Sequence, residues 1–266
     1  MKKNNTFNFI VMIIAGIYLL APIGATIIYS FFRDFTSVIP QGFTLDFYKE
    51  LFAGAGSIWP TLLRTILIGV IPTAITTLIV LLALYGTLVY HPKFDAIMNF
   101  ITKIPYGIQG VILAVAIIAI YANTNTFFSN RVFLLGCSYC VVISPYIYQG
   151  IRNVLLSIDM IPILEAAELL GASKLYTYFK IIVPSIGKGI LATMLLCIGI
   201  LFGDFVLVNI LAGSYYETLG IYLNNVRARS GQVAAGVSTL MFIMMIGFSM
   251  LVNYLNREHK EKIDEE

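Results

Sequence analysis

The chain has 266 residues, of which 59% are hydrophobic and only 12% are charged, and its mean hydropathy is +0.87. Soluble domains carry about 25% charged residues, so this composition excludes a soluble globular protein and indicates an integral membrane protein. The net charge of +3 is small and is spread over the loops, so no nucleic-acid partner is expected.

Six apolar segments are long enough, or nearly so, to cross a hydrocarbon core of about 30 Å as helices of roughly 20 residues. They cover approximately residues 7–31, 60–90, 104–121, 132–155, 188–211 and 233–255. The first follows Met1-Lys2-Lys3 as a signal peptide would, but its apolar run exceeds the roughly 7–15 residues of such a peptide, and we expect a retained helix. The sequence predicts an all-α polytopic membrane protein with one transmembrane domain over residues 1–266.

The basic residues predict the orientation of these helices. With the N-terminus in the cytoplasm, six spans return the C-terminus to the same side, and eleven basic residues fall inside against six outside. Those inside are Lys2, Lys3, Lys93, Lys103, Arg152, Lys174, Lys180, Lys188, Arg257, Lys260 and Lys262; those outside are Arg33, Lys49, Arg64, Arg131, Arg227 and Arg229. We therefore expect cytoplasmic termini and a cytoplasmic loop over residues 157–187.

The expected outer segment 33–59 contains a short amphipathic stretch, Tyr48-Lys49-Glu50-Leu51-Phe52, followed by the breaker Gly54-Ala55-Gly56. This pattern predicts a surface helix. Two roles stay open for it, contact with an outer partner and rest on lipid head groups.

The loop 157–187 predicts a helix, a tight turn and a second helix. Pro162 lies near the start of the first helix and Gly171 just past its end, with Asp159 as a candidate N-cap. Ser173 is expected to cap a second helix over residues 174–182, which Pro184 stops or kinks.

Two faces of the first helix are distinctive. Ala167 and Gly171 lie four residues apart and form a face with almost no side chain, while Glu165 and Glu168 form an acidic pair. Small residues allow a partner to approach this helix closely, and the acidic groups beside them can pair with Arg or Lys of that partner. The pattern therefore suits a helix that docks in a cleft of a partner. An ordinary solvated amphipathic helix explains the same periodicity.

The spacing of residues from Glu165 to Pro184 resembles a known family signature. Glu165-Ala166-Ala167 is followed after three residues by Gly171, and after nine more by Ile181 and Pro184. This resembles the loop through which permeases of binding-protein-dependent ABC importers dock on their ATPase, with Val183 in place of the usual Leu. The resemblance implies a type I importer permease fold with a coupling helix between spans 4 and 5, formed by Glu165, Ala166, Ala167, Glu168 and Gly171.

The same resemblance implies the partners. They are a second permease subunit, homologous or identical, two ATPase subunits at the cytoplasmic loop, a solute-binding protein outside, and the bilayer of a bacterial inner membrane. ATP and Mg²⁺ are then bound by the ATPase, so this chain is expected to have no cofactor and no catalysis of its own. In agreement, the sequence has no Gly-x-x-x-x-Gly-Lys-Ser/Thr motif, and its few Cys and His residues suggest no metal site.

Asp204 is the most unusual residue of the apolar spans. A carboxylate near the middle of a membrane helix is costly, so we expect it to face the bundle or an aqueous path. The preceding Gly199 and Gly203 predict close approach of another helix, and Asn209 and Tyr146 are further candidates for the path. A structural hydrogen bond or ion pair, for instance with Arg64, is the alternative.

The solute is suggested by a weaker resemblance. Phe202-Gly203-Asp204-Phe205 and Glu217-Thr218-Leu219 are similar to the polyamine, iron and phosphonate branch of these permeases. An acid at this place favours a polyamine such as spermidine or putrescine, with an aminophosphonate or ferric ion as alternatives. A transporter driven by an ion gradient is the alternative from another class, although it predicts inverted symmetry between halves and usually more spans.

Overall fold

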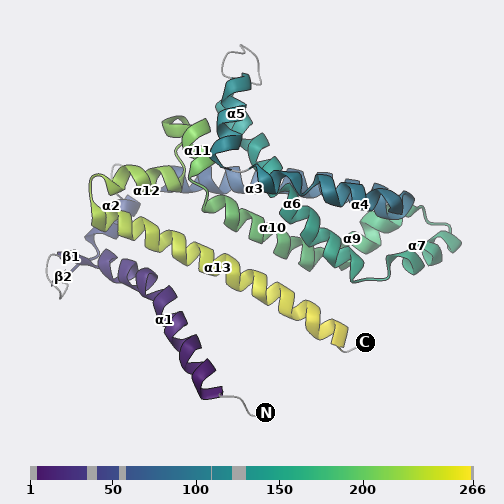
Figure 1. The fold of residues 1–266 in the computed structure, drawn as a ribbon, viewed down its shortest axis with the longest axis horizontal. Coiled ribbons are helices and arrows are strands. Elements are labelled where there is room, and N and C mark those ends of the chain that lie inside the picture. The colour runs from purple at the N-terminus through teal and green to yellow at the C-terminus, as the bar shows by residue number, and fades with distance from the viewer. Residues whose placement is uncertain (1–4, 35–40, 54–57, 109, 122–129, 265–266) are drawn as a thin grey trace. The chain divides into compact units, whose positions relative to one another are not determined.

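The computed structural model describes residues 5–34, 41–53, 58–108, 110–121 and 130–264. These residues form α-helices almost throughout, with one short two-stranded hairpin (Figure 1). The all-α class expected from the sequence is confirmed. The chain divides into two compact units, one made of Met1–Thr61 with Tyr222–Met244 and the other of Leu62–Ile221 with Met245–Glu266.

The first unit joins the N-terminal helix to a short hairpin and to the start of the C-terminal helix. Ser30 Oγ lies 2.7 Å from the Tyr48 hydroxyl, and Gln232 Nε2 donates to the Arg33 carbonyl at 3.1 Å. Its elements are α1 (Asn5–Ser30), β1 (Phe32–Asp34), β2 (Gln41–Phe43), α2 (Asp46–Ala53), the first residues of α3 (Trp59–Tyr85), most of α12 (Leu219–Arg227) and the first part of α13 (Gly231–Asp264).

The amphipathic surface helix expected in the segment 33–59 is α2. The Asp46 amide donates to Thr44 Oγ1 at 3.1 Å, which caps the first turn, and Leu51 is buried while Phe43 and Leu45 before the helix are exposed. The expected breaker at residues 54–56 lies outside the described residues.

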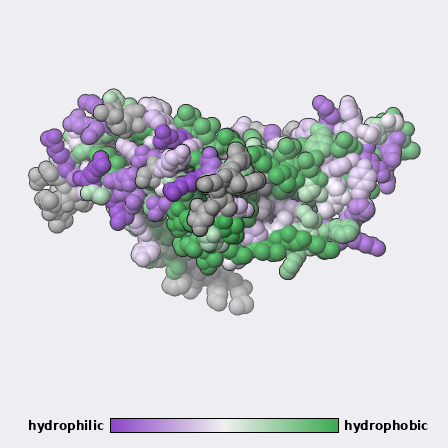
Figure 2. All heavy atoms as spheres, turned by 90° about the horizontal axis from the view of Figure 1, so that it is seen from above, coloured by the Kyte–Doolittle hydropathy of each residue, from purple (hydrophilic) through white to green (hydrophobic). Residues whose placement is uncertain are grey.

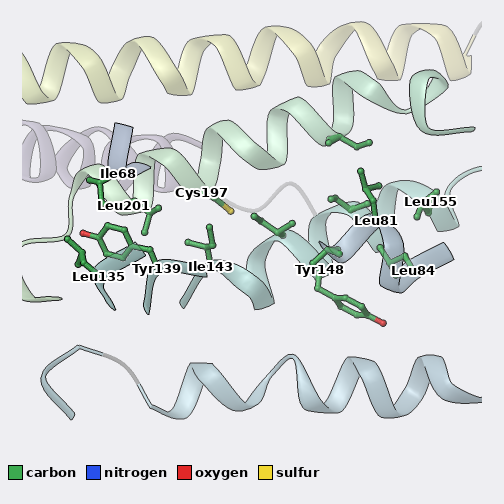
Figure 3. Close-up of a cluster of buried hydrophobic side chains, with 14 of the residues drawn as sticks. Ile68, Leu81, Leu84, Leu135, Tyr139, Ile143, Tyr148, Leu155, Cys197 and Leu201 are labelled. Atoms are coloured by element: carbon green, nitrogen blue, oxygen red, sulfur yellow. The ribbon is translucent and has the colours of Figure 1, made fainter. Parts of the chain in front are cut away.

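The second unit is built around α3, α6 and α10, whose buried side chains form the core in Figure 3. Leu84 of α3, Tyr139 of α6 and Cys197 of α10 are all fully buried there. Besides the rest of α3, its elements are η1 (Gly86–Tyr90), α4 (Pro92–Ile101), η2 (Ile104–Gly107), α5 (Val111–Tyr121), α6 (Arg131–Leu156), α7 (Met160–Leu169), α8 (Lys174–Thr177), η4 (Tyr178–Ile182), α9 (Val183–Ser185), α10 (Gly187–Phe202), α11 (Val206–Leu211) and η5 (Gly213–Tyr216), with the end of α13.

Helices α6 and α10 approach each other closely because each has a glycine at the contact. A Cβ on Gly150 would collide with the Thr193 side chain, and a Cβ on Gly189 would lie 2.8 Å from a Val154 methyl group. Small residues at such points let helix backbones pack in a membrane, where the hydrophobic effect does not drive association.

The helices account for four to six membrane crossings. Four are long and apolar enough by themselves, Val11–Ser30, Trp59–Tyr90, Arg131–Leu156 and Gly231–Tyr254. Two further pairs pass together although each is bent, Lys93–Gly107 with Val111–Tyr121 by 93° and Lys174–Ser185 with Gly187–Phe202 by 70°. The predicted total of six is reached when each bent pair crosses once.

The third and fifth spans are not the straight helices that hydropathy suggested. Helix α5 has 11 residues, which make about 16 Å, too short for a core of about 30 Å. It is separated from α4 by Pro105 and by Gly110, whose φ of +63° belongs to the left-handed region. The fifth span ends as a helix at Phe202, and a new helix starts only at Val206.

Many large hydrophobic side chains are exposed, and the face drawn in Figure 2 has wide hydrophobic areas. On α3, for example, Leu63, Leu78 and Ile79 are each more than half exposed. Such surface is unfavourable in water and suits the hydrocarbon of a bilayer or a partner helix.

Candidate functional sites

Helix α7 is held to its own unit by one buried face. Met160, Leu164 and Ala167 are 8%, 6% and 8% exposed, and the first two belong to the same hydrophobic cluster as Leu155 of α6 and Ile182 of η4. Their spacing of four and three residues places them on one side of the helix. The opposite side of α7 is therefore the side that is free to meet a partner.

The small-residue notch expected from Ala167 and Gly171 is wrong as an open surface. Ala167 belongs to the buried face of α7, so its small side chain is covered by the protein itself. The expected acidic face is present, since Glu165 and Glu168 are exposed together with Ala166. Periodicity alone had placed Ala167 on a face without saying which face is covered.

Gly171 serves the turn rather than a close contact. Its φ is +82°, and a Cβ added to it would meet nothing within 4 Å. The Ala172 amide donates to the Ala167 carbonyl and the Gly171 amide to the Glu168 carbonyl, each at 2.9 Å. These two bonds form the Schellman arrangement, in which a left-handed residue, usually glycine, satisfies the last carbonyls of a helix.

The second half of the loop begins as predicted. Ser173 Oγ accepts from the Tyr176 amide at 3.3 Å, so the predicted cap of α8 is confirmed. Lys174 Nζ lies 3.5 Å from Glu168 Oε2 across the turn. Asp159 occupies the N-cap position of α7, but among the described residues its side chain accepts no hydrogen bond from the first turn.

The loop is anchored to the end of α3 by Tyr178. This side chain is fully buried, and its hydroxyl donates to the Leu81 carbonyl at 3.1 Å. Its ring centre lies 5.0 Å from that of Tyr85. Both tyrosines adjoin or begin π-helical segments, which occur frequently at functional positions. Pro184 follows in the next turn, before the 70° bend that leads into α10.

Two exposed leucines at the end of α7 were not among the site residues predicted from the sequence. Leu169 and Leu170 are 90% and 89% exposed and stand directly before Gly171. Their hydrophobic character was visible in the sequence, but their exposure depends on which side of α7 is buried. The tip therefore offers apolar side chains beside the acidic ones.

Asp204 lies at the break between α10 and α11, not in the middle of a continuous helix as expected. Its Oδ2 accepts a hydrogen bond from the fully buried Tyr139 hydroxyl at 3.0 Å, and the Leu207 amide lies 3.5 Å from Oδ1. The carboxylate borders a hollow of about 560 Å³ whose wall is mainly apolar. Its lining includes Gly110, Tyr139, Gly203, Asp204, Val206 and Met245.

Close approach of another helix was predicted at Gly199 and Gly203, but both face Met245 of α13 at ordinary van der Waals distance, so the structure does not bear this prediction out. A Cβ on Gly203 would lie 3.5 Å from Met245 Cε, and one on Gly199 would lie 3.8 Å from Met245 Sδ. Both glycines also line the hollow beside Asp204. Met245 lines the same hollow.

The other path candidates lie elsewhere. Tyr146 packs edge-on against Tyr106, with ring centres 5.0 Å apart, and Asn209 is exposed on α11. Neither belongs to the described lining of the Asp204 hollow. The hydrogen bond weighed for Asp204 is present, but its partner is Tyr139 rather than Arg64.

Among the described residues, no three His, Cys, Asp or Glu side chains lie close enough together to hold a metal ion. The described chemistry is that of a carboxylate in an apolar hollow and of an anchored helical loop. These features, with multiple apolar spans, define a multi-pass α-helical membrane protein.

A family model described as the binding-protein-dependent transport system inner membrane component matches residues 75–261, and the chain belongs to this family. The matched range includes α6, the whole loop 157–187 and the Asp204 hollow.

Curated relatives carry names of transport permeases. The chain is 25% identical over 212 residues to a spermidine/putrescine transport system permease protein PotC homolog of Mycoplasma genitalium, with 76% of this chain and 72% of the relative covered. It is 19% identical to a putative 2-aminoethylphosphonate transport system permease protein PhnV of Salmonella typhimurium, covering 89% and 87%. It is 30% identical to PotB of Escherichia coli, a spermidine/putrescine permease protein, over 47% and 45%.

The protein is accordingly a permease subunit of a type I ABC importer, a multi-pass protein of the inner membrane. Permeases of this family work with an ATPase and with a binding protein. The relatives are transport subunits, which agrees with a chain that has no catalytic role of its own.

Proposed function

We propose that this permease imports a small solute that carries an alkylammonium group, with a polyamine such as putrescine or spermidine as the first candidate. The observation that carries the proposal is the Asp204 carboxylate at the edge of an apolar hollow of about 560 Å³. A carboxylate in such surroundings favours a cation, and the methylene chain of a polyamine suits the apolar wall.

The relatives support the ammonium group more than one particular solute. Spermidine, putrescine and 2-aminoethylphosphonate, named for two of the relatives, all carry a primary amine. Only the last also carries a phosphonate. The aminophosphonate therefore stays the second candidate, and its anionic group would need a basic partner along the path.

We propose that the ATPase binds α7 and drives transport by moving this helix. Its exposed side carries Glu165, Ala166, Glu168, Leu169 and Leu170, a mixed acidic and apolar surface that suits a groove with a basic rim. Two ATPase subunits would bind two such helices, one on this chain and one on a second permease, homologous or identical. ATP and Mg²⁺ would be held by those ATPases.

The proposed orientation places both termini and the loop 157–187 in the cytoplasm, with a solute-binding protein on the other side. The excess of basic residues on the loop side supports it. In this arrangement ATP binding shifts the permease pair between two states, because only one state suits the closed ATPase dimer.

The proposal is tested by uptake into proteoliposomes that hold the complex and ATP, with proton and sodium gradients collapsed. Labelled putrescine, spermidine and 2-aminoethylphosphonate are compared, each with its binding protein. Asp204→Asn should lower uptake of the amine about tenfold or more, because hydrogen bonds to a charged group contribute roughly 1.5–3 kcal/mol. The control is Asp46→Asn, which neutralises an exposed carboxylate in α2.

Two results would contradict the proposal. Uptake that needs an ion gradient and not ATP would refute the importer mechanism for this chain. Uptake of a neutral solute, unaffected by Asp204→Asn, would refute the role of the carboxylate in choosing the solute.

A further inference from the structure

A polar cluster joins α4 to the second half of α6 in a region otherwise built of apolar residues. Arg152 Nε donates to both carboxylate oxygens of Asp95, at 2.9 and 3.2 Å, and its Nη2 also contacts Oδ2. The two side chains are only 20% and 15% exposed. A guanidinium that grips a carboxylate with several bonds fixes both the distance and the orientation of the two groups.

The cluster is completed by two neighbours on the same helices. The hydroxyl of Tyr148 points out of the hydrophobic cluster in Figure 3 and donates to Asp95 Oδ1 at 3.1 Å. Gln149 Nε2 donates to Asn99 Oδ1 at 2.6 Å, one turn further along α4. Asp95 thus has partners from two positions of α6, and α4 is attached to α6 at two successive turns.

Buried hydrophobic contacts hold α4 in place much less firmly than these polar bonds do. Phe94, Ile97 and Phe100 are 53%, 52% and 72% exposed, and Met98 is the described residue of α4 that packs against the core. A 93° bend separates the segment that holds α4 from α5. The position of α4 therefore depends mainly on its polar bonds to α6.

The same part of α6 leads into the helix that we propose receives the ATPase. Met160, the first residue of α7, follows Arg152 by eight residues and packs in the same cluster as Leu155. In Figure 1 the loop from α7 to α9 continues from the end of α6 beyond α4. Because only residues 157–159 separate the two helices, a displacement of α7 would act on the end of α6, where Arg152 lies.

We propose that Asp95 and Arg152 are positioning residues of transport, which make α4 move together with the end of α6 when α7 is displaced. The inference rests on the proposed function, in which α7 is the element that the ATPase moves. The physical reason is that separating a poorly solvated ion pair leaves two charges without compensation, whereas moving both helices together keeps every bond.

The experiment follows three pairs of spin labels in the complex of permease and ATPase, reconstituted in lipid nanodiscs. Cys137, Cys140 and Cys197 are first replaced by Ser. Labels are then placed at exposed positions, Phe100 in α4, Leu156 at the end of α6 and Ile120 in α5. Distances are recorded by pulsed electron resonance without nucleotide and with ATP under conditions that prevent hydrolysis.

In the unaltered protein we expect ATP to change the Leu156–Ile120 and Phe100–Ile120 distances and to leave the Phe100–Leu156 distance unchanged. Asp95→Asn should remove at least half of the Phe100–Ile120 change while the Leu156–Ile120 change persists. The charge swap Asp95→Arg with Arg152→Asp should restore the change, which a merely structural defect would not allow. Tyr148→Phe, which keeps the ion pair, should cause a smaller loss.

Asp46→Asn is the matched control, because it neutralises an ion pair with Lys49 in which both side chains are more than two-thirds exposed. An undiminished Phe100–Ile120 change in Asp95→Asn would overturn the inference, as would an α4 label that stays with α5 in the unaltered protein. If Asp95→Asn fails to assemble, the swap and Tyr148→Phe decide by the same readout. No ATP response of the Leu156–Ile120 pair would instead refute the proposed drive through α7, and with it the inference.

Discussion

Gly171 illustrates how one residue shapes the loop 157–187. Its φ of +82° ends α7 and turns the chain toward Ser173, while no neighbour occupies the space where a Cβ would stand. Glycine is needed here for its backbone, because other L-residues pay about 1–2 kcal/mol in this region, and Asn pays less.

The left-handed conformation at position 171 predicts that Ala and Asn will differ in how much they disturb the turn. Gly171→Ala should loosen the turn and speed hydrogen exchange of the amides at residues 171 and 172, while Gly171→Asn should do so less. Gly187→Ala is the control, since a Cβ there meets nothing within 4 Å. Equal exchange in Gly171→Ala and the control would show that the left-handed conformation is not required.

Tyr178 is the second residue on which the loop depends. Replacing it by Phe keeps the ring beside Tyr85 but leaves the buried Leu81 carbonyl without the hydroxyl donor. We expect a loss of about 1 kcal/mol in the free energy of unfolding, seen as a lower unfolding temperature in detergent. Tyr176→Phe, at a position that is 57% exposed, should have no such effect; an equal effect would contradict the anchoring role.

At the scale of elements, the contact between α6 and α10 sets the frame on which both candidate sites are mounted. The end of α6 leads to α7, and the end of α10 leads to Asp204. The side chains of Thr193 and Val154 occupy the space that a Cβ at Gly150 or Gly189 would need. Glycine at these two positions therefore allows the helices to come this close.

Gly150→Ala and Gly189→Ala should therefore each destabilise the protein, by about 1–3 kcal/mol as is usual for overpacked cores. Gly136→Ala, also in α6 but with nothing within 4 Å of the added methyl group, should be neutral or stabilising. Thermal unfolding of the purified protein measures all three, and an unchanged midpoint for Gly150→Ala would show that the helices can separate at little cost.

At the scale of the whole molecule, the spans set which surfaces face the ATPase and which face the binding protein. The proposed orientation puts Ser173 of the loop inside and Phe43 of the hairpin outside. In a cysteine-free background, a membrane-impermeant thiol reagent added to intact cells should label Phe43→Cys and should label Ser173→Cys only after permeabilisation. The reverse pattern would place α7 on the wrong side for an ATPase.

The local signals of the loop were readable from the sequence alone. Gly171 and Ser173 act through the backbone of their immediate neighbours, so their identity was enough to predict the turn and the cap. The spans were readable for a similar reason, since the hydropathy of about twenty successive residues decides whether a helix can enter the bilayer. The breaks inside the third and fifth spans were not predicted, because glycines such as Gly110 and Gly203 also occur in unbroken membrane helices.

The class of this protein, an apolar multi-pass permease of an ABC importer, was thus indicated by composition and by one motif. Tertiary structure alone decided that Ala167 is buried and Leu169 exposed, that Asp204 is bonded to Tyr139, and that Asp95 meets Arg152. The last two pairs are 65 and 57 residues apart in sequence. Side chains so distant meet only when the helices that carry them pack, and that packing depends on the fit of many side chains at once, which no local pattern records.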